Sequence, residues 1–530
     1  MPQDSLHIAK SAGLISLATL ISRVLGLARE QMIAVLFSRY ATDAFYVAFR
    51  IPNLLRDLFA EGAMSSAFVP TFTEHLKKRT TAEAWKLASN VLNILLVTLS
   101  VITLLGFYSA DWLVLQFAGE FRSVPGKLEL TVVLTRIMFP FLPLVAIAAV
   151  IMGILNSQGN FFVPALAPAL FNVGSLVVAP ALYFWLSHLG YDPILGMAIG
   201  TLSGGLLQLL VQVPPLLRKG FVYSADLSFK HPGVRRILLL MGPGTIGLAS
   251  TQINIFVNTW LATSEGEGPV SWLNYAFRLM QFPLGIFGVA IATAALPTVS
   301  SQAATDAVAD LRRTLSAALR MVFLINIPAT AGLIALSQPI VALIYQHGKF
   351  KLSDTIATSN ALIFYALGLL AYSSIKVLVP AFYALGHSRV PVAISSVTVG
   401  INIALNLWLV RVMGYVGLAL GTSLASFGNL ILLLFWLQKY TGPVDPAGLA
   451  RTFFKMVSAS LVMGLACARL QAYLSLGETL PERFLNVAVS IGAGLLVLFL
   501  CCRLLRVGEL ETALRLLLRK VTQMSQRQAG

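Results

Sequence analysis

The chain has 530 residues and a formal net charge of +16 at pH 7, and 57% of its residues are hydrophobic while only 11% are charged. About a quarter of the residues in a soluble globular protein are charged, so this composition excludes a soluble protein and indicates a polytopic membrane protein. The three cysteines lack metal-site spacing and are interpreted as small apolar residues: Cys467, Cys501 and Cys502.

Taken in chain order, about fourteen apolar segments are long enough to cross a bilayer, which takes ~20 residues in a helix. Lipid leaves only helices or closed barrels, and barrel strands would be shorter and alternating, so these runs predict an all-α fold. No cleaved signal peptide is visible, and the first segment is expected to act as its own insertion signal. The segments cover residues 11–36, 43–70, 87–109, 130–155, 161–187, 193–217, 236–262, 271–298, 314–345, 356–382, 390–410, 415–438, 452–474 and 484–506.

Lysine and arginine are distributed unevenly across the membrane if the N-terminus is cytoplasmic and each predicted segment crosses once. The cytoplasmic side then holds 23 of these residues, the opposite side holds 8, and the remaining 7 lie inside the segments. Basic residues concentrate on the cytoplasmic side, so both termini are expected in the cytoplasm. Topology explains most of the basic excess, and no nucleic-acid partner is expected. The tail at 503–530 is predicted to be a basic amphipathic helix at the membrane surface, or a solvated tail.

The first two segments carry several charges. A charge near the bilayer centre costs about 3 kcal/mol even on the most lenient scale, so these residues are expected to face a polar interior and to serve a function. The alternative is that they only neutralise one another as ion pairs, but basic residues outnumber acidic ones in the membrane segments. The arginines are Arg23, Arg29, Arg50 and Arg56, and the acidic residues are Glu30, Asp43, Asp57 and Glu61.

Short matches at a nearly constant offset predict an internal duplication. Gly196 and Gly200 recur as Gly417 and Gly421, and the tripeptide AFR at 48–50 recurs at 276–278. Two six-helix halves of like orientation would be related by a pseudo-twofold axis, with a substrate site between them. The predicted organisation is an N-terminal six-helix lobe at 1–217, a cytoplasmic linker at 218–235, a C-terminal six-helix lobe at 236–442, two additional transmembrane helices at 443–508 and a basic cytoplasmic tail at 509–530.

The sequence contains no Walker A loop, HExxH, GxSxG or aspartate-rich diphosphate motif. We therefore expect a transporter without catalytic residues, metal or cofactor. Four neutral polar residues could offer oxygens to a coupling cation, or they could only hydrogen-bond helices together, and both interpretations stay open. They are Asn258, Asn402, Asn406 and Thr422.

Four motifs resemble the MurJ (MviN) family of lipid II flippases, within the multidrug/oligosaccharidyl-lipid/polysaccharide exporter superfamily. They are SRVLGLARE at 22–30, ATDAF at 41–45, IPNLLRDLFAEGAMSSAFVP at 51–70 and SWLNYAFRLMQFPLGIFGVAIATAALP at 271–297. The resemblance covers nearly the whole chain. It implies a flippase of the bacterial cytoplasmic membrane that moves undecaprenyl-pyrophosphate-linked peptidoglycan precursor from the inner to the outer leaflet by alternating access.

The resemblance also implies a cationic cavity for the pyrophosphate and a groove beside the last two helices for the polyprenyl tail. Guanidinium groups bind phosphate oxygens through bidentate, charge-assisted hydrogen bonds, so the residue chemistry agrees. Acidic residues near Arg56 would keep the anion from being trapped. The expected substrate-binding residues are Arg23, Arg29, Arg56, Arg278, Asp43 and Glu61.

The expected partners are lipid II, membrane lipids and the peptidoglycan synthesis machinery. Coupling to the membrane potential or to a monovalent cation is an open alternative, with the cation site of the family falling at the four polar residues above. Two rival functions are export of another polyprenyl-linked saccharide and multidrug export by the same fold.

Overall fold

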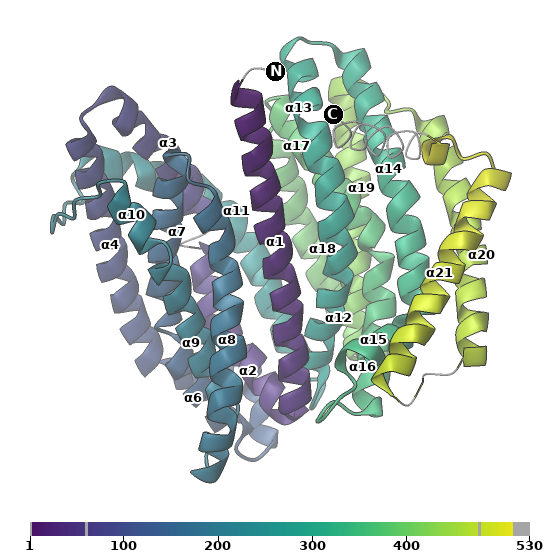
Figure 1. Cartoon of the computed structure of the whole chain (residues 1–530), viewed down its shortest axis with the longest axis horizontal. Coiled ribbons are helices and arrows are strands. Elements are labelled where there is room, and N and C mark those ends of the chain that lie inside the picture. Colours follow the sequence, from purple (N-terminus) through teal and green to yellow (C-terminus); the bar gives the residue numbers. More distant parts are fainter. Residues whose placement is uncertain (1–2, 59–61, 475–476, 478, 512–530) are drawn as a thin grey trace, which may run out of the picture. The chain divides into compact units, whose positions relative to one another are not determined.

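The computed structural model describes residues 3–58, 62–474, 477 and 479–511. These ranges contain helices and no strand (Figure 1), which confirms the all-α prediction. The chain divides into two compact units: unit 1 is Met1–Ser271 with His347–Phe350, and unit 2 is Trp272–Gln346 with Lys351–Gly530.

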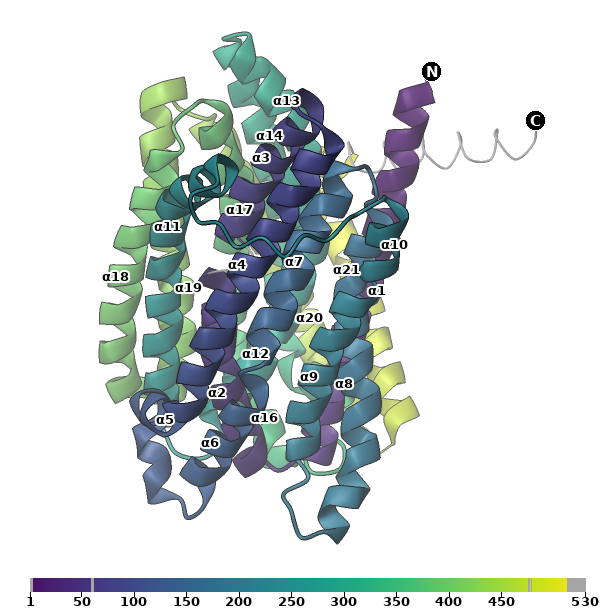
Figure 2. The same ribbon diagram turned by 90° about the vertical axis from the view of Figure 1, so that its left-hand side faces the viewer.

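Unit 1 is a bundle whose long helices run side by side (Figure 2). Its hydrophobic core lies between α3, α4 and α7, where the rings of Phe68, Phe72 and Trp85 pack in series. The helices are α1 (Gln3–Leu36), α2 (Arg39–Arg56), α3 (Gly62–Lys78), α4 (Thr81–Tyr108), α5 (Ala110–Ala118), η2 (Gly119–Ser123), α6 (Lys127–Met138), α7 (Phe141–Ser157), α8 (Phe162–His188), α9 (Leu195–Leu210), α10 (Val213–Arg218) and α11 (Pro232–Thr263).

Unit 2 has its core between α13, α14, α17, α19 and α20, with Phe382 and Leu433 fully buried. Its first helix begins at Pro269, at the end of unit 1, and continues into unit 2. The helices are α12 (Pro269–Pro283), the π-helix η3 (Leu284–Gly288), α13 (Val289–Ala304), α14 (Val308–Ala335), α15 (Ser337–Tyr345), α16 (Leu352–Leu367), α17 (Leu369–Ala384), α18 (Arg389–Met413), α19 (Tyr415–Thr441), α20 (Pro446–Leu474) and α21 (Leu480–Leu504).

The glycines of the predicted duplication have the same packing role in each unit. A Cβ on Gly196 of α9 would stand 3.1 Å from the carbonyl oxygen of Ala179 on α8. A Cβ on Gly417 of α19 would stand 2.4 Å from the carbonyl oxygen of Leu409 on α18. Small residues let helices approach closely in membranes, so each match marks a tight helix pair.

Ten helices of the described residues are long and apolar enough to cross a membrane, or eleven if the bent pair α16 and α17 forms one span. The three other predicted segments correspond to α1, to α2 with α3, and to α11. The count of fourteen stays a prediction.

The structure differs from the predicted segments and lobes in two features. The second segment is not one unbroken helix, because α2 ends at Arg56 and α3 begins at Gly62. The contact-defined division falls at Ser271, so α11 packs with unit 1. The lobe boundaries at 217 and 236, which derive from the duplication, remain a prediction, and the predicted tail helix lies outside the described residues from 512 onward.

Candidate functional site

A buried charged cluster joins α1, α2 and α8 within unit 1. Arg29 donates to Glu30 Oε1 at 2.9 Å, and the Tyr46 hydroxyl donates to Glu30 Oε2 at 2.5 Å. The Arg29 guanidinium lies 5.2 Å from the ring centroid of Phe171. Its Nε is buried and has no hydrogen-bond partner among the described residues. Buried donors are normally satisfied by protein, water or ligand, so the hydrogen-bonding capacity of the Arg29 guanidinium is not filled by the described residues.

Two further predicted arginines of unit 1 differ in their surroundings. Arg23 of α1 is partly exposed and forms no ion pair or hydrogen bond with any described residue. Arg56 pairs with the adjacent Asp57 through two hydrogen bonds of 3.2 and 2.7 Å. The other carboxylate oxygen of Asp57 accepts from Gln252 at 3.4 Å. The ion-pair alternative therefore applies to Arg29 and Arg56, whereas Arg23 keeps its charge available.

Arg278 lies on α12 in unit 2 and is solvent-exposed. The preceding residue, Phe277, contacts the Tyr365 ring edge-on at 5.3 Å between centroids. Phe277 therefore packs against a neighbouring helix, and neither sequence neighbour of Arg278 is an acid.

Asp43 has a different environment from the arginines. Its carboxylate is fully buried and accepts from Lys127 Nζ at 3.0 Å, from the Gly268 amide at 2.6 Å and from the Ser271 amide at 2.9 Å. The Ser271 hydroxyl adds a fourth hydrogen bond of 2.6 Å. Both oxygens are thus occupied by the protein, and the carboxylate fastens the start of α12 to α2 and α6. Glu61, the remaining predicted acid, lies outside the described residues.

The predicted cation residues do not all fall in one unit. Asn258 is on α11 of unit 1, and the other three are on α18 and α19 of unit 2. Asn406 donates to Asn402 Oδ1 at 3.1 Å, with both side chains buried. Thr422 donates to the Leu418 carbonyl of its own helix at 2.7 Å. Within the described ranges no group of three histidine, cysteine or acidic side chains is placed to hold a metal.

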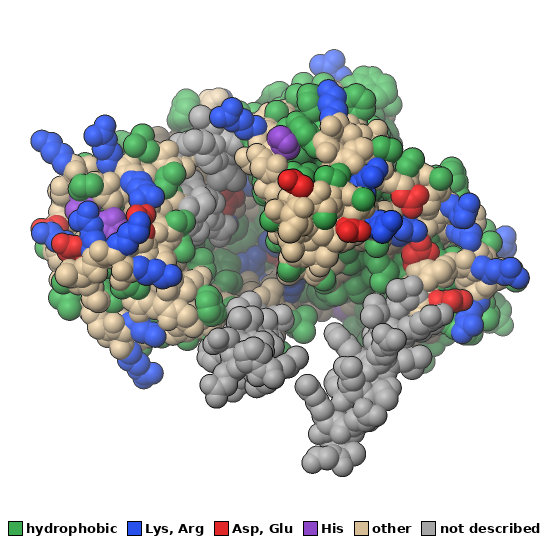
Figure 3. Space-filling view, turned by 90° about the horizontal axis from the view of Figure 1, so that it is seen from above, with side chains coloured by type: hydrophobic (Ala, Val, Ile, Leu, Met, Phe, Trp, Pro, Cys, Tyr) green, Lys and Arg blue, Asp and Glu red, His purple; other side chains and the backbone are tan. Residues whose placement is uncertain are grey.

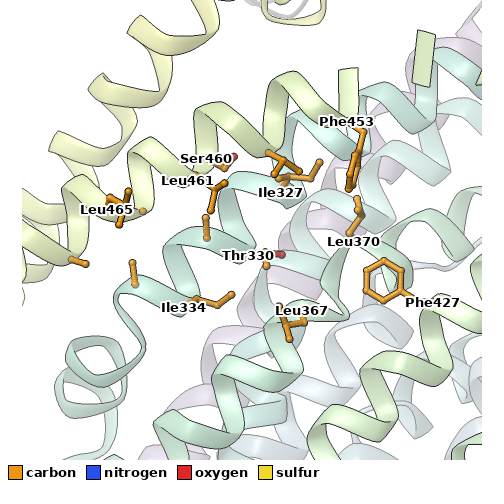
Figure 4. Close-up of a pocket in the computed structure, with 15 residues that line it drawn as sticks. Ile327, Thr330, Ile334, Leu367, Leu370, Phe427, Phe453, Ser460, Leu461 and Leu465 are labelled. Carbon is orange, nitrogen blue, oxygen red and sulfur yellow. The ribbon is translucent and has the colours of Figure 1, made fainter. Parts of the chain in front are cut away.

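An apolar cavity of about 500 Å³ lies between α14 and α20, with contributions from α16, α17 and α19 (Figure 4). Its walls are aliphatic and aromatic side chains such as Ile334, Phe427 and Leu465. The Ser460 hydroxyl is buried without a hydrogen-bond partner among the described residues. The sequence analysis expected the groove for the tail beside the last two helices, α20 and α21. This cavity is lined by α20, and no described residue of α21 lines it.

Sequence reasoning missed several residues that complete these clusters. Tyr46, Phe171 and Gln252 are ordinary residues of apolar helices, and nothing in their spacing indicated the contacts above. Lys127 precedes the predicted segment at 130–155, yet it is fully buried, with Nζ 4.2 Å from the centroid of Phe121. Its only sequence signal is a position at the very start of an apolar run.

The family model described as lipid II flippase MurJ matches residues 32–483. The lipid II flippase MurJ of Burkholderia cenocepacia is 37% identical, over 84% of this chain and 86% of the relative. The probable lipid II flippase MurJ of Vibrio cholerae is 38% identical, over 81% of this chain and 82% of the relative.

Solved structures agree with these relatives. A lipid II flippase MurJ in an inward closed conformation has a TM-score of 0.77 and 27% identity, covering 92% of this chain and 99% of that chain. An inward-facing multidrug resistance MATE transporter of the MOP superfamily has a TM-score of 0.67 at 19% identity, covering 80% of this chain and 95% of that chain. The second likeness concerns the fold alone.

A helical membrane fold with this set of likenesses defines a polytopic membrane transporter rather than an enzyme. Within that class, the chain belongs to the lipid II flippase MurJ family. The predictions of family, fold class and transporter are therefore confirmed.

Proposed function

We propose that this chain moves lipid II from the inner to the outer leaflet of the bacterial cytoplasmic membrane by alternating access. The observation that carries this function is the match to the lipid II flippase family over residues 32–483. The chemistry of the membrane arginines supports it, since a pyrophosphate crossing a bilayer needs cationic donors.

Arg23, Arg29, Arg56 and Arg278 are proposed to bind the pyrophosphate. Arg29 supports this most directly, because its buried Nε has no partner among the described residues. Arg56 would exchange part of its contact with Asp57 for the anion, and the neighbouring acid would limit the affinity so that the anion can leave. Glu61 is proposed to share this moderating role.

Asp43 is proposed to act by position rather than by touching the substrate. Its four accepted hydrogen bonds leave little capacity for a ligand, and a carboxylate would repel a pyrophosphate. By fastening Gly268 and Ser271 it sets where α12, the helix of Arg278, begins.

The apolar cavity between α14 and α20 is proposed to hold part of the polyprenyl tail. Its volume of about 500 Å³ and its aliphatic walls suit an isoprenoid chain and no charged group. The tail site is therefore proposed at α20 with α14, and the groove expected at α20 with α21 stays a prediction.

Topology and coupling complete the proposed function. Both termini are proposed to be cytoplasmic, as the basic bias indicates, and peptidoglycan synthesis enzymes are proposed as partners that consume the exported lipid. The membrane potential, or a monovalent cation at Asn258, Asn402, Asn406 and Thr422, is proposed to drive the cycle. If a cation acts there, Asn406→Leu should abolish any sodium or potassium dependence of transport.

The experiment that tests the function is complementation. The chain is expressed in cells whose own lipid II flippase can be depleted, and growth is followed after depletion. Sustained growth with normal cell shape is expected. Lysis despite normal membrane abundance of the protein would favour an exporter of another polyprenyl-linked saccharide or of drugs.

A further inference from the structure

A second basic site lies apart from the membrane arginines, where the last turn of α3 meets the first turn of α11. A cavity of about 270 Å³ opens there, lined by Glu74, His75, Lys78, Arg79, Gly233 and Arg236. Figure 3 shows histidine side chains among lysines and arginines in its left-hand group. The cavity joins two helices that are about 160 residues apart in sequence, since Arg236 contacts Glu74 at a separation of 162.

The positive charge of this cavity is only partly neutralised from within. Glu74 accepts from Lys78 at 3.0 Å and from Arg236 at 2.6 Å, and these contacts lower the pKa of Glu74. Among the described residues, the acidic partner of the Arg79 guanidinium is the exposed Glu83, at the long distance of 3.9 Å. The lining of the cavity therefore contains three cationic side chains, Lys78, Arg79 and Arg236, and one carboxylate, Glu74.

The pKa of a neighbouring histidine responds to the same field. Burial lowers the pKa of His231, and the positive charges of His75, Arg79 and Lys86 lower it further against the opposing effect of Asp226. The surroundings of the cavity thus keep a positive potential, in which an anion is favoured.

A strap, residues 222–228, is hydrogen-bonded along α4 and precedes the first turn of α11. Asn90 donates to the Ser228 carbonyl and accepts from the Ser228 amide, both at 2.8 Å. Asn93 donates to the carbonyls of Ser224 and Asp226 at 2.9 and 2.8 Å.

The strap leads directly into the first turn of α11. His231 Nδ1 accepts from the Gly233 amide at 3.1 Å and caps the helix. A Cβ on Gly233 would stand 2.7 Å from Leu87 of α4, so the end of α11 is packed tightly against its neighbour. The basic groups are therefore presented on a fixed frame, which lowers the entropy lost on binding.

We propose that this cavity binds a phosphate group, with Lys78, Arg79 and Arg236 as its cationic ligands. Guanidinium and ammonium groups form strong charge-assisted hydrogen bonds with phosphate oxygens. Glu74 occupies two of the cations when the cavity is empty, so it competes with the ligand. The phosphate could belong to the headgroup of an acidic phospholipid or to a soluble phosphate, and the chemistry of recognition is the same.

The test is a binding measurement on the full-length protein in a neutral detergent, which requires no transport and so stands apart from the flippase function. The probes are dioctanoyl phosphatidic acid, inorganic phosphate and dioctanoyl phosphatidylcholine. Binding of phosphatidic acid alone assigns a lipid headgroup, and binding of inorganic phosphate as well assigns a soluble phosphate. Equal binding of phosphatidylcholine, or binding of none of the probes, overturns the proposal.

Variants locate the binding. Arg79→Gln and Arg236→Gln should each weaken it about tenfold or more, because each removes a charged hydrogen bond. Arg218→Gln, which changes an exposed arginine of α10 outside the cavity, should leave it unchanged. Glu74→Gln should strengthen binding, because it removes the competing carboxylate, and this gain cannot come from misfolding. Unchanged affinity in both arginine variants, or weaker binding in Glu74→Gln, would overturn the proposal.

Discussion

Lys127 donates a 3.0 Å hydrogen bond to Asp43 across 84 residues of sequence, and both side chains are fully buried. The pair connects α6 to α2, and Asp43 also holds the loop that leads into α12. A buried ion pair is costly to break, because the remaining partner keeps its charge without compensation.

Lys127→Met is therefore expected to destabilise the protein by about 3–5 kcal/mol. The measurement is the melting temperature of the purified protein in detergent. Lys349→Met, the same change at an exposed lysine, should have little effect. Adding Asp43→Asn to Lys127→Met should recover part of the lost stability, because the unpaired charge is gone. If the stability lost by the double variant equals the sum of the losses in the two single variants, the two residues are not coupled.

The strap at 222–228 should open when its asparagine contacts are removed. Asn90→Ala and Asn93→Ala each remove two hydrogen bonds to the partly exposed backbone of the strap, at a cost of about 0.5–1.5 kcal/mol per bond. Trypsin should then cut at Lys219 and Lys230 several-fold to about a hundred-fold faster than in the parent.

Thr98→Ala, at an exposed position of the same helix α4, serves as the control for the proteolysis and should be cut at the parental rate. If the asparagine variants are cut no faster than this control, the strap does not depend on the observed hydrogen bonds.

The His231 cap should make stability dependent on pH. Burial and nearby positive charges lower the pKa of His231 below its ordinary value of 6.5, so the unfolded state binds the proton more tightly. The stability contributed by His231 is full above about pH 6.5 and is lost as the pH falls through the lower folded-state pKa. Protonation also removes the acceptor for Gly233.

Melting temperatures at about pH 7.5 and about pH 4.5 test this sign. His231→Asn keeps a capping oxygen and removes the titrating group. Its melting temperature should therefore fall less on acidification than the melting temperature of the parent. His188→Asn, at an exposed histidine, should leave the parental difference intact. An equal loss in His231→Asn and parent would refute the role of His231.

The tail cavity predicts where a polyprenyl chain binds. A photoreactive amino acid at Leu465, which lines the cavity, should crosslink a polyprenyl phosphate probe several-fold more than one at Leu496 of α21. Both residues are largely exposed apolar positions, so the comparison controls for general contact with lipid. Equal labelling at the two positions would remove the cavity as a tail site.

The sequence predicted the helical class well, because long apolar runs have one stable form in lipid. The sequence singled out candidate arginines but did not predict the partners of each charge, since the orientation of a helix face depends on its neighbours; the role of these arginines stays a prediction. Arg29 illustrates this: its partner Glu30 is adjacent in sequence, yet Tyr46 and Phe171, which complete the cluster, come from other helices.

Other features needed tertiary information altogether. The burial of Lys127 depends on the approach of α2, and the cavity between α14 and α20 depends on how two distant helices pack. The second predicted segment also divides into α2 and α3, a break that hydropathy alone does not mark.

The central claim is that membrane arginines of this chain bind the lipid II pyrophosphate during transport. It is tested most directly by a leaflet-accessibility assay of lipid II in cells depleted of their own flippase and supplied with one variant each. Arg23→Ala and Arg29→Ala should leave lipid II inaccessible from outside while the protein remains at parental abundance, and Arg29→Lys should restore little, because lysine lacks the planar fork. Arg122→Ala, at an exposed position of η2, should move lipid II normally. Parental accessibility of lipid II with both Arg23→Ala and Arg29→Ala would contradict the account.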